Sequence, residues 1–191
     1  NIREDEQKAI FGEVTIPASD KTDITVGFRK YETENTFDAK DGYFGYYETD
    51  PVLGFVGRTN VYKFDDSGVV PKFNIAHRPN DDLLVYATYS EGFRPSGVNR
   101  TTGRTAELVP DTYTSDLLRN LELGWKSSLA DGKVTFNGLV YSMNWEDYQS
   151  TRYLYNLLTV AYVENVGMAT VNGAELSSYF NSSDSLSMSL M

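Results

Sequence analysis

Alternation of apolar and polar residues is the feature that most constrains the fold of this chain. Between residues 120 and 126, three apolar side chains alternate with polar residues and one glycine. The same period of two recurs at 24–29, 73–78 and 83–90, whereas helical periodicity is almost absent. Successive side chains of a strand point to opposite faces. The pattern therefore predicts an all-β chain whose sheet has one apolar and one polar face.

Connections between the strands alternate between short and long. The short ones lie at 17–21, 79–82, 130–133 and 181–185, and the long ones cover about 32–68, 94–113 and 148–159. Within one short connection, Asp131-Gly132 favours a two-residue hairpin turn, because glycine accepts the positive φ of a primed turn. We therefore expect eight strands in four hairpins, at about 8–16, 22–31, 69–78, 83–93, 114–129, 133–147, 160–180 and 186–191.

Short turns on one side and long loops on the other are typical of an antiparallel up-and-down transmembrane β-barrel, with periplasmic turns and extracellular loops. Strands of about 9–11 residues cross a bilayer when tilted, and most of the expected strands are at least that long. Aromatic residues gather near both strand ends, as in the girdles of such barrels. Two alternatives stay open at this point: a porin-like or small structural outer-membrane barrel, and a soluble β-rich binding module.

Composition excludes several classes of function. The 17 Lys+Arg against 27 Asp+Glu give a net charge of −10, and a nucleic-acid binder needs a basic face. The chain has no Cys and a single His, His77, so no Cys site or His-pair metal motif can form. The Asp-bearing loops match no EF-hand spacing. We expect no metal, no cofactor, no catalytic residues and no enzymatic activity.

Four segments resemble consecutive strands of a TonB-dependent receptor barrel: "FGEVTIPASDKTDITVGFRKYE", "PKFNIAHRPNDDLLVYATYSEGFRPSGVNR", "NLELGWKSSLADGKVTFNGLVYSMNWEDYQ" and "ENVGMATVNGAELS". The resemblance implies a barrel of the Gram-negative outer membrane that imports scarce ligands such as ferric siderophores. Its partners would be membrane lipid, a plug domain, the TonB system and a small chelate ligand. Residues 1–191 would then be part of the barrel, truncated at both ends and without the plug.

The long loops supply the candidate ligand-binding residues. The stretch "FDAKDGYFGYYETD" carries Tyr43, Phe44, Tyr46 and Tyr47, and clustered Tyr with Gly is typical of binding surfaces. Arg94 and Arg100 follow the strand at 83–93, and guanidinium groups match anionic ligands such as an iron chelate. The alternatives are a loop that packs on itself and an ion pair between loops.

The polar face of the expected sheet carries charges of both signs, which either pair with each other in a wet lumen or touch a plug or ligand. They are Glu13, Arg29, Lys72, Arg78, Glu122, Lys126 and Glu175. The strand at 133–147 does not divide into two clean faces, because Leu139, Tyr141, Met143 and Trp145 oppose Val134 and Phe136. Either a bulge or an aromatic-filled lumen would explain that pattern.

Overall fold

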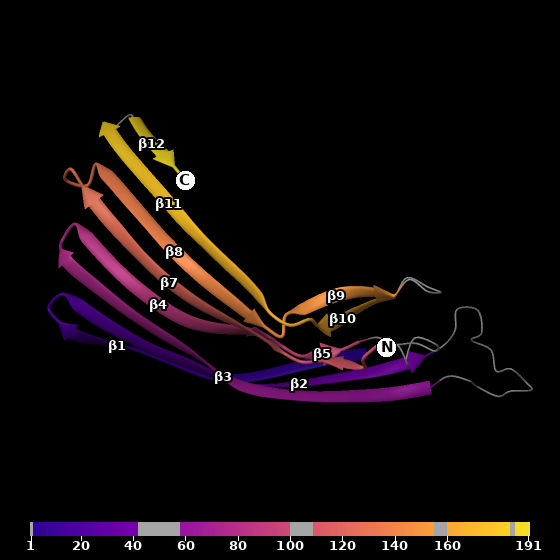
Figure 1. Cartoon of the computed structure of the whole chain (residues 1–191). Coiled ribbons are helices and arrows are strands. Elements are labelled where there is room, and N and C mark those ends of the chain that lie inside the picture. Colours follow the sequence, from indigo (N-terminus) through magenta and orange to yellow (C-terminus); the bar gives the residue numbers. More distant parts are fainter. Residues whose placement is uncertain (1, 42–57, 100–108, 155–159, 184–185) are drawn as a thin grey trace, which may run out of the picture.

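One antiparallel sheet dominates the computed structural model, which describes residues 2–41, 58–99, 109–154, 160–183 and 186–191. Neighbours in the sheet follow chain order, so the topology is up-and-down (Figure 1). No helix among these residues is long and apolar enough to cross a membrane. The eight strands of the sheet are β1 (Ile2–Ser19), β2 (Thr22–Asp41), β3 (Arg58–Asn80), β4 (Leu83–Arg94), β7 (Asp116–Leu129), β8 (Val134–Glu146), β11 (Ala169–Ser183) and β12 (Leu186–Leu190).

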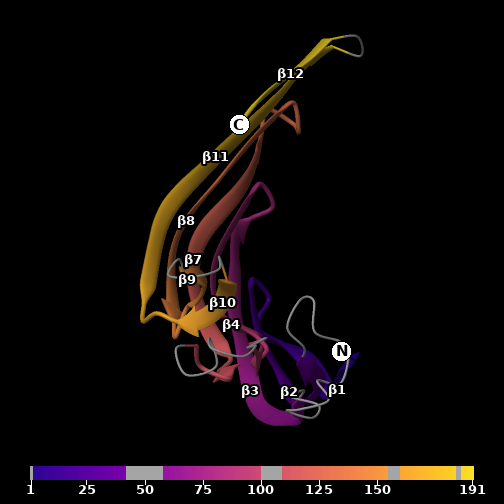
Figure 2. The same cartoon turned by 90° about the vertical axis from the view of Figure 1, so that its right-hand side faces the viewer.

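Two short strand pairs stand apart from this sheet. They are β5 (Gly97–Val98) with β6 (Thr112–Tyr113), and β9 (Gln149–Leu154) with β10 (Val160–Asn165). Both lie at the end of the sheet where β4 ends and β7 begins (Figure 1). The sheet itself is curved, and its described strands end in two open edges at β1 and β12 (Figure 2). This open sheet does not support a closed small barrel formed by these strands alone.

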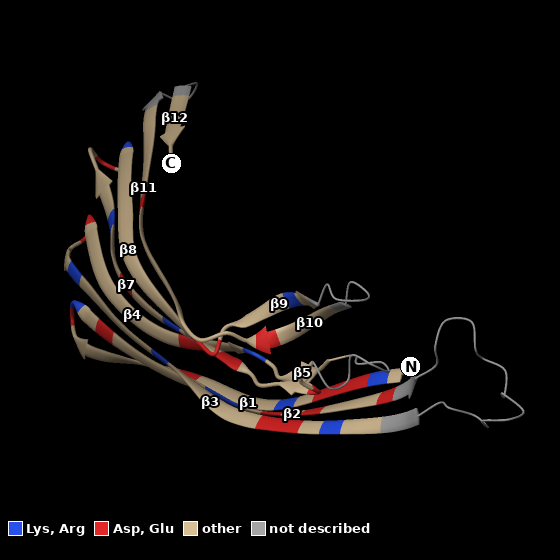
Figure 3. Ribbon diagram, turned by 45° about the vertical axis from the view of Figure 1, so that its right-hand side comes forward, with Lys and Arg blue, Asp and Glu red and all other residues tan. Residues whose placement is uncertain are grey.

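The expected long connection at 32–68 is wrong over most of its length. Strand β2 continues to Asp41 and β3 begins at Arg58, with pairs from Tyr31–Gly68 to Asp41–Arg58. The parts of β1, β2 and β3 that lie beyond the Tyr31–Gly68 pair carry charges of both signs, with acids in excess (Figure 3). Charged strands lack an apolar face, so the period of two gives little signal there.

The single strand expected at 160–180 is also wrong, because the chain breaks between β10 and β11. Gly167 has a φ of 100°, a left-handed conformation that interrupts the extended backbone. The Val166 N–H donates to the Tyr148 carbonyl at 2.9 Å, which closes the base of the β9–β10 hairpin. Strand β10 therefore pairs with β9, and β11 starts anew beside β8.

Strand register divides the sheet into two faces, as the alternation predicts. Ile75 lies beside Ala87, and Ala87 beside Leu123, so apolar side chains form one continuous face. On the other face Thr88 lies beside Glu122. No register shift interrupts β8 against β7 or β11, which excludes a bulge there. The register instead places Leu139, Tyr141, Met143 and Trp145 on the polar face, beside Glu122 and Thr88.

A turn does lie at Asp131-Gly132, but the predicted two-residue loop is too short: the last ladder pair is Leu129–Val134, so four residues, 130–133, connect β7 to β8. The φ angles of Ala130, Asp131 and Gly132 are 54°, 53° and 83°. The Lys133 N–H donates to the Ala130 carbonyl at 3.2 Å. Positive φ at Asp131 and Gly132 is what a primed turn requires, and the further positive φ at Ala130 extends the connection beyond a two-residue loop.

Glycines opposite aromatic rings are a recurrent device of this sheet. In each case the register places the two residues directly across from one another, and a Cβ on the glycine would collide with the ring. The ring thus fills space that the glycine leaves empty, which stabilises an otherwise weak strand position. The pairs are Tyr31–Gly68, Tyr86–Gly124, Tyr113–Gly97, Trp125–Gly138 and Tyr141–Gly173.

We predict that Gly124→Val destabilises the full-length protein by about 1–3 kcal/mol, because overpacking forces the Tyr86 ring or the backbone to move. The change would be measured on gels as the temperature at which the folded, heat-modifiable form of the protein disappears. Gly92→Val is the matched control, since a Cβ at Gly92 meets nothing within 4 Å. Equal thermal stability of the two variants would contradict the role assigned to the ring.

Candidate functional site

Buried side chains concentrate at one end of the molecule, which we call the mouth: residues 31–37, 93–99, 109–116, 145–154 and 160–165. Elsewhere the described sheet is one layer thick and its side chains are exposed or half-exposed. Five of the buried residues are polar, which is unusual for a core and indicates a built polar arrangement. The buried non-glycine residues are Tyr31, Thr33, Asn35, Ser96, Asn99, Val109 and Asp116.

An ion pair between Arg94 and Asp116 occupies the centre of the mouth. The Asp116 side chain is 0% exposed, whereas that of Arg94 is 43% exposed. The Arg94 main-chain N–H donates to Asp116 Oδ1 at 3.1 Å, and Nε donates to Oδ2 at 2.9 Å. Nη2 also donates to Oδ2. Together these charge-assisted bonds hold the last residue of β4 against the first residue of β7.

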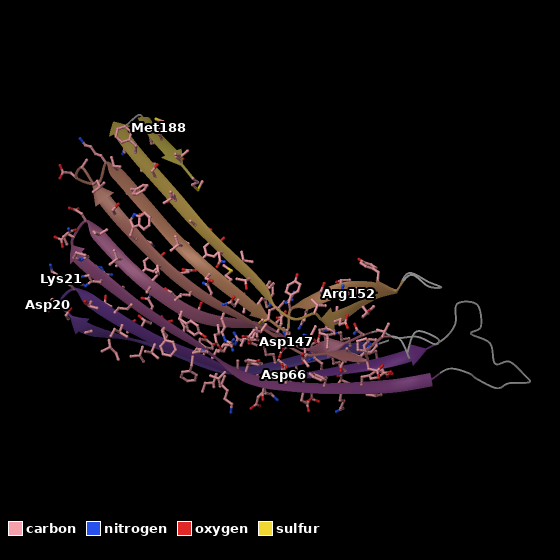
Figure 4. The ribbon with its side chains drawn as sticks, in the orientation of Figure 1. Asp20, Lys21, Asp66, Asp147, Arg152 and Met188 are labelled. Carbon is pink, nitrogen blue, oxygen red and sulfur yellow. The ribbon has the colours of Figure 1, made fainter. Side chains whose placement is uncertain are left out.

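Aromatic rings fix the Arg94 guanidinium from the side of β8. The guanidinium carbon Cζ of Arg94 lies 4.5 Å from the centre of the Trp145 ring and 5.2 Å from the centre of the Tyr148 ring, within the range of cation–π contact. The two rings meet edge to face at 4.8 Å. Asp147 between them has a φ of 51°, which turns the chain toward β9 (Figure 4).

The main chain of Gln149 completes the surroundings of the ion pair. Its N–H donates to Asp116 Oδ2 at 3.1 Å, and its carbonyl accepts from Arg94 Nη2 at 3.0 Å. Burial alone would raise the pKa of Asp116, but the Arg94 side chain and the Gln149 N–H outweigh it. The pKa of this carboxyl therefore lies below its ordinary value of 3.8.

Two contacts within the mouth tie β2 to the end of β4 and to the residues that follow it. The rings of Tyr31 and Phe93 stack with centroids 3.5 Å apart and planes 9° apart. Asn35 Nδ2 donates to the Ser96 carbonyl at 3.4 Å. Beside Asn35 lies a small open hollow between β1, β2 and β5. It is lined by Arg3, Asp5, Asn35, Thr36, Phe37 and Val98.

Of the residues predicted to bind ligand, the described part of the chain contains only Arg94. It lies at the mouth and is bonded to Asp116, while more than a third of its side chain stays exposed. The others, Tyr43, Phe44, Tyr46, Tyr47 and Arg100, fall outside the described residues.

Asp116 and Gln149 were not predicted as site residues. The only sequence signal for Asp116 is its position directly before the apolar alternation of β7. The described residues contain no group of three or more His, Cys, Asp or Glu side chains arranged to hold a metal ion.

Charges on the polar face are partly paired. Lys72 Nζ lies 2.8 Å from Glu13 Oε2, and Arg78 Nη1 lies 2.7 Å from Asp23 Oδ2. Glu122 accepts a hydrogen bond from Asn120 at 2.8 Å. At Glu13, Lys72 and Arg78 the charges thus compensate each other within the wall.

The architecture defines a class: an up-and-down antiparallel wall with one apolar and one polar face, and with polar loop structure built on one end. Residues 1–190 match the family described as TonB dependent receptor-like, beta-barrel. The chain belongs to this family.

Solved structures share the fold. The ferric yersiniabactin uptake receptor FyuA from Yersinia pestis is 22% identical, with a TM-score of 0.73 over 95% of this chain and 25% of the receptor. The copper transporter OprC is 14% identical, with a TM-score of 0.69 over 93% and 27%. The closed form of the ferric-catecholate import receptor Fiu from E. coli K12 is 17% identical, with a TM-score of 0.62 over 95% and 26%. The chain thus spans about a quarter of each of these proteins.

We predict that Asp116→Asn loosens the mouth and removes part of the acid sensitivity of the protein. The folded pKa lies below the unfolded one, so the ionised carboxylate stabilises the fold above the ordinary pKa. That stability is lost as the pH falls through the lower, folded value. The unfolding temperature of the full-length protein should therefore fall less steeply from neutral to acid pH in Asp116→Asn than in the parent. At neutral pH the unfolding temperature of the variant should already be lower.

The expected loss at neutral pH is about 1.5–3 kcal/mol, the cost of a charged hydrogen bond, with the half-exposed Arg94 favouring the lower end. Asp23→Asn is the control, because it breaks a more exposed ion pair with Arg78 that should contribute about 0–1 kcal/mol. Parallel pH profiles for the parent and Asp116→Asn would refute the assignment.

Proposed function

We propose that this chain is part of the wall of an outer-membrane active transporter of a Gram-negative bacterium, and that its ligand is a ferric siderophore or a similar iron chelate. Family membership over residues 1–190 is the observation that carries the proposal. Two of the similar structures are receptors for ferric ligands, one for ferric yersiniabactin and one for ferric catecholates. The activity is transport and not catalysis.

The two faces of the sheet support a membrane location. In this proposal the apolar face, with Ile75, Ala87 and Leu123, meets lipid, and the polar face lines the lumen. Main-chain groups in lipid must be paired within the protein, and a closed barrel meets that requirement. In this proposal residues 1–191 supply part of the barrel wall and part of its mouth. A plug domain and the TonB system are the proposed partners, through other parts of the receptor.

Ligand capture is assigned to the mouth, on the extracellular side. Tyr43, Phe44, Tyr46 and Tyr47 supply stacking surface, since tyrosine combines large contact area with low entropy cost. Arg94 and Arg100 supply positive charge for an anionic chelate. The Arg94 side chain is still 43% exposed while Asp116 holds it, which supports a contact with ligand at this position.

Membrane assembly tests the orientation of the faces. We expect Leu123→Arg to impair assembly of the full-length receptor, because a charge at mid-bilayer depth costs about 2–4 kcal/mol on the lipid face of a barrel. Thr88→Arg, on the opposite face of the neighbouring strand, should be tolerated better. Heat-modifiability of outer-membrane fractions reports folding. Similar damage from both substitutions would mean that the faces are assigned wrongly.

Ligand binding tests the arginines. We expect Arg94→Ala with Arg100→Ala to weaken binding of an anionic ferric catecholate by whole cells, at about 1.5–3 kcal/mol per lost charged contact. Arg94→Ala removes a proposed ligand contact and also breaks the ion pair with Asp116. Arg100→Ala alone therefore separates the loss of a ligand contact from the loss of this ion pair. A ferric hydroxamate chelate without net charge is the comparison ligand. An unchanged Kd for every ferric chelate at equal surface expression would return both arginines to a structural role.

A further inference from the structure

Three side-chain amides join two segments that are far apart in the sequence. The first segment, which we call the connector, consists of residues 94–99 and 109–116 and carries β5 and β6. The second is the β9–β10 hairpin. The amides belong to Asn99 in the connector, and to Gln149 and Asn165 in the hairpin.

Asn99 binds the hairpin as a neighbouring strand would. Its Nδ2 donates to the Val163 carbonyl at 2.7 Å, and its Oδ1 accepts from the Val163 N–H at 2.7 Å. One side chain therefore satisfies both main-chain groups of a residue on β10. The same Nδ2 donates to the Pro110 carbonyl at 2.9 Å. Asn99 is only 4% exposed, so these bonds are made away from solvent.

Asn165 repeats the arrangement in the opposite direction. Its Oδ1 accepts from the Thr114 N–H at 2.9 Å, and its Nδ2 donates to the Thr114 carbonyl at 3.0 Å. The hairpin thus binds the connector through Asn165, while the connector binds the hairpin through Asn99. Nδ2 of Asn165 also donates to the Asp147 carbonyl at 2.6 Å, where the hairpin begins.

Gln149 adds a third link. Its Nε2 donates to the Pro95 carbonyl at 3.0 Å and to the Thr114 carbonyl at 2.9 Å. These two residues lie at opposite ends of the connector, so Gln149 also holds the ends together.

Neither segment has enough structure to be stable alone. An isolated two-stranded hairpin is marginal in water, and β5 and β6 pair over only two residues each. Asn99, Gln149 and Asn165 supply the bonds that each segment lacks. Elements that are stable only together open together.

We infer that the connector and the β9–β10 hairpin form one structural unit, positioned by Asn99, Gln149 and Asn165, so that a ligand touching either segment displaces both. The unit is anchored to the wall because its first and last residues, Arg94 and Asp116, also belong to β4 and β7, and because Asn35 of β2 donates to the Ser96 carbonyl. The extracellular location and the ligand rest on the proposed function, whereas the coupling rests on the contacts alone.

Hydrogen exchange of the full-length receptor in detergent tests the coupling without any ligand. Asn99→Ala should raise exchange at least tenfold throughout β9 and β10, including amides that do not bond to Asn99. Asn165→Ala should raise it to a similar degree in β5 and β6. If faster exchange is confined to Val163 in the first variant and to Thr114 in the second, the two segments are independent and the inference is wrong.

Asn74→Ala is the matched control, because Asn74 also donates two side-chain hydrogen bonds but lies within the wall, beside Thr88. It should leave exchange at the mouth unchanged. Gln149→Ala keeps the Gln149 N–H bond to Asp116 and is the milder variant. If Asn99→Ala fails to assemble, Gln149→Ala replaces it, and faster hydrogen exchange is then expected in β5 and β6. Because no ligand is used, loss of the coupling and loss of the transport function give separate results.

Discussion

Antiparallel pairing between consecutive strands is the interaction on which the rest of this structure depends. From β4 through β7 and β8 to β11 the register runs without a shift, so the position of a residue in its strand decides the face on which its side chain lies. The same regularity brings the ends of these strands to one level. Arg94, Asp116 and Trp145 meet there because the ladder places them there.

Where the strand ladder ends, polar side chains supply the hydrogen bonds to the main chain. Beyond Arg94 and before Asp116 the main chain has few strand partners, and a buried group without a partner would cost free energy. The side-chain amides of Asn99 and Asn165 make hydrogen bonds to main-chain groups that a neighbouring strand would otherwise make. The mouth is therefore held together by directional bonds more than by apolar burial. Its geometry is correspondingly sensitive to single polar substitutions.

The wall could be predicted from the sequence because its alternation reports burial on one side. The outer ends of β1, β2 and β3 could not, since both of their faces are polar. Arg94 was identified because it follows a strand end, but its partner Asp116 is 22 residues away. That pairing emerges only from the register, as do the bonds of Asn99 and Asn165. Contacts of this kind depend on three-dimensional neighbours that no local pattern encodes.

The glycine–aromatic pairs restrict the order in which their two residues can be substituted. Shortening Tyr86 leaves a gap that surrounding groups or water can fill, whereas adding a side chain at Gly124 collides with the ring that is present. A lineage that exchanges the two residues must therefore lose the ring before it gains the side chain. Receptors that diverge along such a path pass through an intermediate with neither group. That intermediate is less stable, yet it can still pair its strands.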